Sequence, residues 1–170
     1  SWASTPGIAA RFVHSPSHVL LYWGGRRQTT HGEQQRPMLA RIHSCAVLGI
    51  DGIPLSIEVD SSPGMAKVIM VGLPDAAVKE SQERVSSALK NSGFRPSRGT
   101  TVINLAPADI RKEGSALDLP IAIGMLAATD QIPGRRITEF AIVGELALDG
   151  SLRTVAGALP MALSARALGR

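Results

Sequence analysis

The chain has 170 residues, 44% of them hydrophobic and 19% charged, which is enough for one domain with an apolar core. Its single cysteine excludes an internal disulfide bond and is typical of a reducing compartment. The longest apolar run, residues 119–128, is far shorter than the roughly 18 residues that span a bilayer, so we expect a cytoplasmic protein with no membrane segment.

The net charge of +4 is unevenly distributed along the chain. Residues 1–37 hold four arginines against Glu33, whereas residues 38–170 hold 14 basic and 13 acidic side chains. The second part therefore lacks the basic excess of a typical nucleic-acid-binding surface. DNA contact by a stripe of cations stays an alternative, although interspersed glutamates favour a solvated face. These cations are Lys79, Arg84, Lys90, Arg95 and Arg98.

Residues 1–37 show no sustained periodicity, and we interpret them as an unstructured leader. They contain arginine and serine and almost no acidic residues, as a transit peptide does. The favoured reading is that Met38 is the natural start and that the leader is upstream or added sequence. The predicted domain is therefore residues 38–170. We expect it to be truncated at its C-terminus, because Arg170 ends the chain within a helical pattern without a cap.

From Met38 onward the sequence predicts mixed α and β structure. Residues 42–50 and 55–59 are predicted strands, joined at Asp51-Gly52, which is a strong hairpin signal. His43 and Cys45 share one face of the first strand, but two potential ligands do not make a metal site. Residues 67–71 predict a short buried strand.

Residues 75–92 predict an amphipathic helix, which Gly93 ends in a left-handed cap, and residues 101–105 predict the next strand. The apolar residues of this helix recur on one face: Val78, Val85, Ala88 and Leu89. Near the end of the chain, residues 143–155 contain a second turn signal at Asp149-Gly150. An apolar helix then follows over residues 159–168, which we expect to join the core with Arg166 exposed.

A polar connector, residues 106–117, links the 101–105 strand to the next helix. It contains a dense charged cluster, which is either a contact surface or a solvated loop. The cluster consists of Asp109, Arg111, Lys112 and Glu113.

Asp118 is the predicted N-cap of the helix that follows the connector. Pro120 is tolerated only in a first helical turn, so we expect the Asp118 carboxylate to accept a hydrogen bond from the Ile121 N–H. The carboxylate would also meet the positive end of the helix dipole. The loss of such a cap costs about 0.5–2 kcal/mol. A helix start at Ser115, with Asp118 as its capping-box partner, is the alternative.

Three long motifs carry a resemblance to a known family: VGLPDAAVKESQERVSSALKNSGF (71–94), VINLAPADIRKEGSALDLPIAIGM (102–125) and VGELALDGSLRTVAGALP (143–160). Together they closely resemble the N-terminal domain of the ComM (YifB) family of Mg-chelatase-like AAA ATPases, over about residues 39–170. The resemblance implies an α+β fold of the ribosomal protein S5 domain 2-like type, related to the proteolytic domain of Lon. It also implies a non-catalytic module of a hexameric ATPase that acts on DNA, in recombination during natural transformation.

The ATPase motor itself is not expected in this chain. A P-loop ends in Gly-Lys followed by Ser or Thr, and no Gly-Lys pair occurs in the 170 residues. We therefore expect no cofactor here. The resemblance assigns ATP and Mg²⁺ to a module that lies downstream, and it makes the charged cluster a candidate contact for that module, a neighbouring subunit or substrate.

The resemblance also assigns the positions of the Lon protease dyad to this sequence. The nucleophilic serine falls on Asp118 and the lysine falls near Leu159, so neither residue type is kept and we expect no dyad. A Ser-Lys hydrolase using Ser115 and Lys112 is an alternative function, although their spacing does not force contact. A nucleic-acid-binding module in its own right is a further alternative function.

Overall fold

The structure is a computed structural model, and it describes residues 11–15, 18–22 and 39–169. The chain divides into two compact units, residues 1–34 and 35–170. In the first unit, β1 (Arg11–Ser15) pairs antiparallel with β2 (His18–Tyr22). The prediction of an unstructured leader is therefore wrong for these ten residues, whose apolar and β-branched side chains favour strands. The other leader residues lie outside the described ranges.

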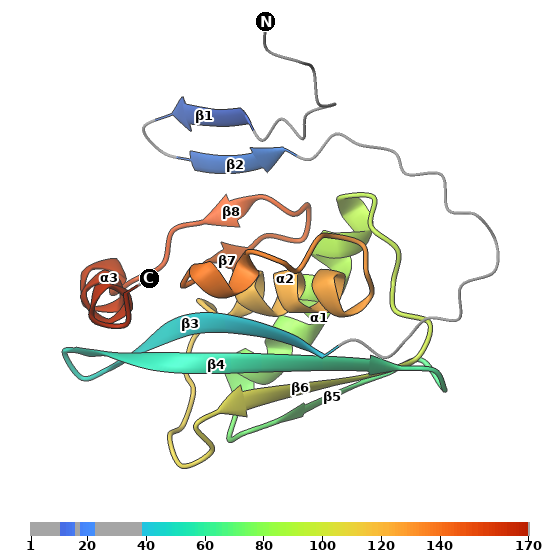
Figure 1. Ribbon diagram of the computed structural model, residues 1–170, viewed down its shortest axis with the longest axis horizontal. Helices are drawn as coiled ribbons and strands as arrows, with labels where there is room; N and C mark the ends of the chain where they lie inside the picture. The colour runs from blue at the N-terminus through green and yellow to red at the C-terminus, as the bar shows by residue number, and fades with distance from the viewer. Residues whose placement is uncertain (1–10, 16–17, 23–38, 170) are drawn as a thin grey trace, which may run out of the picture. The chain divides into compact units, whose positions relative to one another are not determined.

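The second unit is an α+β domain built on a four-stranded mixed sheet in the order β3-β4-β6-β5 (Figure 1). The strands are β3 (Ala40–Leu48), β4 (Asp51–Ser62), β5 (Lys67–Val71) and β6 (Thr100–Ala106). Only β5 and β6 are parallel, because α1 (Ala76–Asn91) connects them as a crossover. The mixed α and β content predicted from the sequence is confirmed.

The helix α2 (Asp118–Ala128) forms the centre of the core, against the sheet. Nine of its eleven residues are buried, as expected for a helix that is apolar on all sides. Close packing requires Gly124, since a Cβ there would lie 2.6 Å from Val59 Cγ2 and 3.2 Å from Ile42 Cδ1. The predicted inner face of α1 is also confirmed: Val78, Val85 and Ala88 are buried.

The hairpin between β3 and β4 turns two residues earlier than predicted. Leu48 pairs with Asp51 and Val47 pairs with Gly52, so Gly49 and Ile50 form the loop, and Gly49 adopts the positive φ of 64°. Gly52 is needed for close packing and not for a turn, because a Cβ at this position would lie 2.1 Å from the Pro160 carbonyl oxygen. The Asp51-Gly52 turn prediction is therefore wrong.

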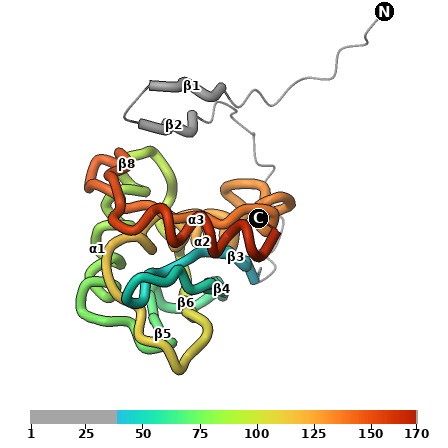
Figure 2. The backbone as a smooth tube through the Cα atoms, turned by 90° about the vertical axis from the view of Figure 1, so that its left-hand side faces the viewer, coloured from blue at the N-terminus to red at the C-terminus, as the bar shows by residue number. Residues whose placement is uncertain are grey.

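The remaining elements are η1 (Ile137–Glu139), the short hairpin β7 (Glu145–Leu146) and β8 (Leu152–Arg153), and α3 (Ala158–Ala167). The predicted turn at Asp149-Gly150 is confirmed, with Gly150 at a φ of 87°. In contrast, α3 contributes only Met161 to the buried residues, and the expectation of a core helix is wrong. It crosses the end of the β3–β4 hairpin, where Gly157 meets Val47 (Figure 2).

No helix among the described residues is both long and apolar enough to cross a membrane.

Candidate functional site

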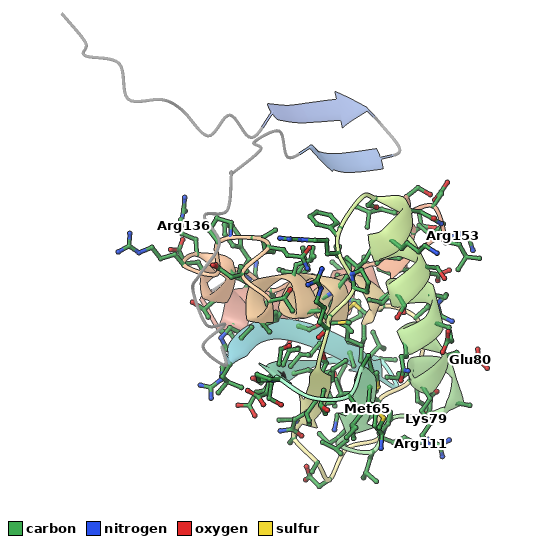
Figure 3. The ribbon with its side chains drawn as sticks, turned by 90° about the vertical axis from the view of Figure 1, so that its right-hand side faces the viewer. Met65, Lys79, Glu80, Arg111, Arg136 and Arg153 are labelled. Atoms are coloured by element: carbon green, nitrogen blue, oxygen red, sulfur yellow. The ribbon has the colours of Figure 1, made fainter. Side chains whose placement is uncertain are left out.

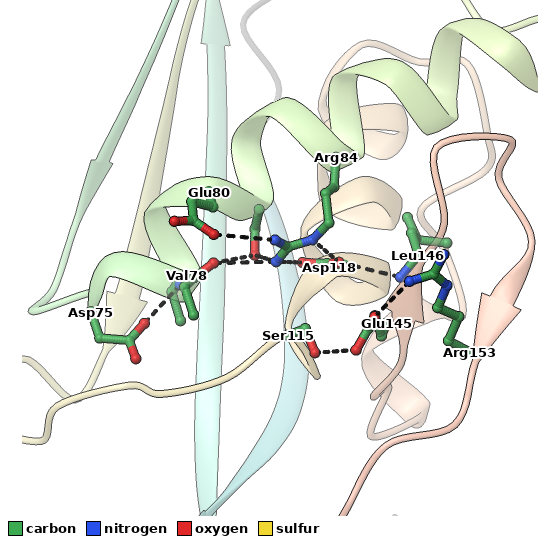
Figure 4. Close-up of polar contacts among 11 residues, drawn as sticks. Asp75, Val78, Glu80, Arg84, Ser115, Asp118, Glu145, Leu146 and Arg153 are labelled. Carbon is green, nitrogen blue, oxygen red and sulfur yellow. Dashed lines mark hydrogen bonds and ion pairs between the residues drawn. The ribbon is translucent and has the colours of Figure 1, made fainter.

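The Asp118 carboxylate lies at the centre of a polar network between α1, α2 and β7 (Figure 4). Its side chain is fully buried. It accepts hydrogen bonds from Arg84 Nε at 2.8 Å and Arg84 Nη2 at 3.0 Å, and from the Leu146 N–H at 3.2 Å. One carboxylate therefore joins three elements that are distant in the sequence.

Arg84 reaches this carboxylate from the inner side of α1. Its Nη2 also donates to the Ala77 carbonyl oxygen at 3.2 Å and to Ser81 Oγ at 3.1 Å. The hydrogen bond to Asp118 is the main cause of a raised pKa for the guanidinium. Since this charge is paired within the domain, Arg84 is not available for a phosphate-binding stripe.

Asp118 is not the helix N-cap, and that prediction is wrong. Leu117 precedes the first helical residue, and its carbonyl oxygen accepts the hydrogen bond from the Ile121 N–H at 3.1 Å. Pro120 does lie in the first turn, as its missing N–H requires. The carboxylate turns away from the helix start because the Arg84 guanidinium offers two charge-assisted donors in a buried place.

A second polar contact lies beside the first. The Ser115 hydroxyl donates to Glu145 Oε2, and Arg153 Nη1 lies 3.5 Å from Glu145 Oε1. These contacts tie the end of the connector to the β7–β8 hairpin. Neither contact could be predicted from the sequence, because nothing local indicates which distant charge Glu145 or Arg153 would meet.

Lys112 is buried, so it does not belong to an exposed charged surface as predicted. Its ammonium donates to the carbonyl oxygens of Gly72, at 2.9 Å, and of Pro107. Its backbone N–H donates a hydrogen bond to the Leu73 carbonyl oxygen, and its own carbonyl oxygen accepts one from the Asp75 N–H. Both residues lie on the segment after β5. Burial lowers the pKa of this ammonium, while the charge of Asp109 opposes the shift. The lysine thus holds the connector against the end of β5.

The three other members of the charged cluster are exposed. Arg111 and Glu113 form a solvent-exposed ion pair at 3.7 Å, and Arg111 extends outward (Figure 3). An exposed pair of this kind contributes little to stability. A contact role for Asp109, Arg111 and Glu113 stays a prediction.

The structure does not bring the candidate catalytic residues together. Lys112 contacts backbone carbonyls while Ser115 contacts a carboxylate, so the proposed Ser-Lys pair is not formed. Of the two positions that the resemblance assigns to the Lon dyad, Asp118 is ion-paired and Leu159 has 72% of its surface exposed. The arrangement favours a role in holding elements together.

Cys45 is buried in β3, and this burial raises the pKa of its thiol despite a hydrogen bond with Ser164. A buried thiol of raised pKa is a poor nucleophile. His43 is half-buried on the same strand. In the described part of the chain, no group of three or more His, Cys, Asp or Glu residues is placed to hold a metal ion.

Comparison with known proteins shows the family. The sequence profile of subunit ChlI of Mg-chelatase matches residues 57–170. The YifB protein of Escherichia coli K12 is 47% identical over 132 residues, which cover 78% of this chain and 26% of YifB. Competence protein ComM of Haemophilus influenzae is 47% identical over 128 residues, which cover 75% of this chain and 25% of ComM.

A weaker similarity extends to Lon proteases. Lon protease 1 of Bacillus subtilis is 25% identical over 154 residues, which cover 85% of this chain and 20% of that protease. The chain spans about a quarter of the length of the YifB and ComM proteins that it matches.

Proposed function

The chain belongs to the Mg-chelatase-like family that includes YifB and ComM, and from this membership we propose that it is a non-catalytic module of a larger AAA ATPase. We further propose that the ATPase acts in DNA recombination during natural transformation. The observation that carries this proposal is the 47% identity with a competence protein over three quarters of the chain.

The chain matches only about a quarter of the length of YifB and of ComM. This supports a longer protein in which the module and the ATPase are separate parts. In this proposal, ATP and Mg²⁺ bind to the remaining part, which also forms a hexamer in the cytoplasm. Residues 38–170 form the module, and residues 1–37 precede it. Its fold is of the ribosomal protein S5 domain 2-like type, which the similarity to Lon proteases supports.

The polar network supports a structural role for the position of the former nucleophile. The Asp118 carboxylate accepts hydrogen bonds from Arg84 and from the Leu146 N–H, and the Ser115 hydroxyl donates one to Glu145. A Ser-Lys mechanism needs the amine within hydrogen-bonding reach of the hydroxyl. The Lys112 ammonium instead donates to two backbone carbonyls.

A chimeric protein tests this function. Residues 39–170 replace the matching segment of Haemophilus influenzae ComM, and the chimera is returned to a strain that lacks ComM. We expect the chimera to raise transformation frequency above that of ComM without the segment. A chimera that is produced at normal levels and hexamer size, yet gives no increase, would contradict the proposed role.

DNA contact by the module is tested separately. Purified chain is titrated with single-stranded and branched DNA over a salt series, with and without residues 1–37. Because residues 38–170 are nearly balanced in charge, we expect weak binding that is lost with the leader. Salt-sensitive binding that survives removal of the leader would instead mean that residues 38–170 contact the DNA.

A further inference from the structure

The helix α3 crosses the hairpin of β3 and β4 and contacts both strands (Figure 2). Cys45, Val47 and Gly52 lie on one side of this hairpin, because side chains alternate along β3 and Gly52 pairs with Val47. A Cβ on Gly52 would lie 2.1 Å from the Pro160 carbonyl oxygen. A Cβ on Gly157, at the start of the helix, would lie 2.5 Å from Val47 Cγ2. The backbone of α3 therefore lies directly against this side of the hairpin.

Cys45 is buried where α3 meets the hairpin. It is 1% exposed, and its thiol forms a hydrogen bond with Ser164 of α3. The residues before and after it, Ser44 and Ala46, point to the other side of the hairpin. With α3 in contact, the thiol is shielded from solvent.

Few buried side chains hold α3 in this position. Of its ten residues, all within the described part of the chain, only Met161 is buried. Neither Met161 nor Cys45 belongs to the main cluster of buried apolar residues among those described. Leu159 and Leu163 of the same helix are 72% and 48% exposed. A segment with so few buried apolar contacts is typical of the least stable part of a fold.

The start of α3 adds little stability to the helix. Gly157 precedes the first helical residue with a positive φ of 76°, and no side chain caps the helix there. A helix of ten residues is marginal by itself in water, so α3 depends on its contact with the hairpin. The hairpin does not depend on α3 in the same way, because β3 pairs with β4 along its whole length and β4 also pairs with β6.

We propose that α3 is a latch that detaches from the hairpin as a unit, turning about Gly157, while the sheet, α1 and α2 stay folded. The open form exposes the Cys45 thiol and the side of the hairpin beneath the helix. Glycine permits the change of backbone angles that this turning requires. The latch does not depend on the proposed ATPase function.

The test is the reaction of Cys45 with the disulfide reagent DTNB in the folded 170-residue chain. The chain has one cysteine, so the reaction reports this site alone. We expect its rate to exceed, by about tenfold or more, the rate that global unfolding in the same buffer would allow. The rate should depend only weakly on low urea concentrations, because the opening of α3 exposes less surface than unfolding does.

Two glycine substitutions separate local opening from global unfolding. Gly157→Ala should speed the reaction by about tenfold or more, because its Cβ would meet Val47 and displace α3 from the hairpin. Gly93→Ala is the matched control, since Gly93 also has a positive φ, of 82°, but a Cβ there would meet nothing within 4 Å. It should lower global stability and leave the reaction rate unchanged, because the end of α1 is the same in the closed and open forms.

Met161→Ala is a second variant that serves even where Gly157→Ala does not fold. It removes the one buried side chain of α3 and should also speed the reaction. Unchanged rates in the α3 variants that fold overturn the proposal, as does a reaction with the urea dependence of global unfolding. A Gly93→Ala variant whose reaction accelerates as much as its global stability falls also overturns it. So does a reaction as fast as that of the unfolded chain, because α3 would then not shield the thiol.

Discussion

Arg84 and Asp118 form a two-point ion pair that joins α1 to α2, with Nε–Oδ2 at 2.8 Å and Nη2–Oδ1 at 3.0 Å. The carboxylate is fully buried, while the guanidinium keeps 23% of its side-chain surface exposed. A buried charge is tolerated only when its partners are in place. The pair therefore makes the position of each helix depend on the other.

Asp118→Ala should lower the free energy of unfolding by about 3 kcal/mol, since it strips Arg84 and the Leu146 N–H of a buried acceptor. This is more than the loss of a helix cap would cost. Urea denaturation measures the change. Glu80→Ala is the control, because Glu80 is a distant and exposed partner of Arg84 at 3.9 Å, and its loss should change stability by less than about 0.5 kcal/mol. Equal effects of the two substitutions would refute the role of the buried pair.

Lys112→Met should lower the free energy of unfolding by about 1 kcal/mol at neutral pH, because two carbonyl oxygens lose a donor. The neighbouring Arg111→Met is the control and should have almost no effect, since Arg111 is exposed. If both variants had the same free energy of unfolding in urea as the unmodified chain, the buried contacts of Lys112 would contribute nothing to stability.

The same variant tests the pKa of Lys112. Burial lowers this pKa in the folded chain, so the unfolded chain binds more protons between that value and the ordinary pKa of about 10.4. The contribution of Lys112 to the free energy of unfolding should therefore rise as pH rises through this window. The difference in stability between the unmodified chain and Lys112→Met should grow with pH. A constant difference would show that the pKa is not lowered.

Glu58 should titrate below its ordinary range. Hydrogen bonds from Asn104 and, secondly, Arg41 lower the pKa of this carboxyl on the sheet surface. Its stabilising contribution is complete above the ordinary glutamate pKa of about 4.3 and is lost as pH falls through the lower folded-state value. Carboxyl NMR titration should show the pKa rising in Asn104→Ala and also in Arg41→Ala, because Arg41 contributes its charge as well as a hydrogen bond. An unchanged pKa in Asn104→Ala would contradict the role of that hydrogen bond.

Gly124→Ala should destabilise the domain by about 1–2 kcal/mol. The added methyl group would clash with Val59 and Ile42, and this overpacking outweighs the better helix propensity of alanine. Thermal denaturation measures the loss. Gly134→Ala is the control, because its Cβ would meet only Ala127 Cβ, at 4.0 Å. A more stable Gly124→Ala variant would mean that the sheet and α2 can move apart at little cost.

Ser115 should not react with a fluorophosphonate probe, because its hydroxyl donates to Glu145 and is not paired with an amine. Labelling is followed by mass spectrometry of the intact chain and of its peptides. Specific labelling of Ser115 that disappears in Lys112→Ala would restore the Ser-Lys hydrolase as the function. The Ser87→Ala variant, whose substitution lies on α1 and not in the connector, controls for non-specific labelling of serines.

Local patterns predicted much of the secondary structure. The strand over residues 67–71 is observed with the expected bounds. Asp75 is the N-cap of α1, and its side chain accepts a hydrogen bond from the Val78 N–H at 2.7 Å. Gly93 follows α1 with a φ of 82°, as its left-handed cap requires. These features depend on neighbours in the chain, so their signals lie within a few residues.

The errors arose where distant contacts override a local preference. Gly52 looked like a turn residue but makes room for Pro160, about a hundred residues later. Lys112 looked solvated, yet its ammonium is buried and donates to the Gly72 carbonyl oxygen, 40 residues earlier in the chain. The apolar residues of α3 looked like core, but most of that helix is exposed in the described domain.

The sequence by itself determined the family, the mixed α and β content and the main helices and strands, because periodicity and caps are local and the motifs are long. Only the tertiary structure decided what the charged residues do. Asp118, with a helix-capping signal, became the buried partner of an arginine 34 residues away. The physical reason is that a buried charge takes the strongest donors within reach, and the chain order does not state which donors folding will bring there.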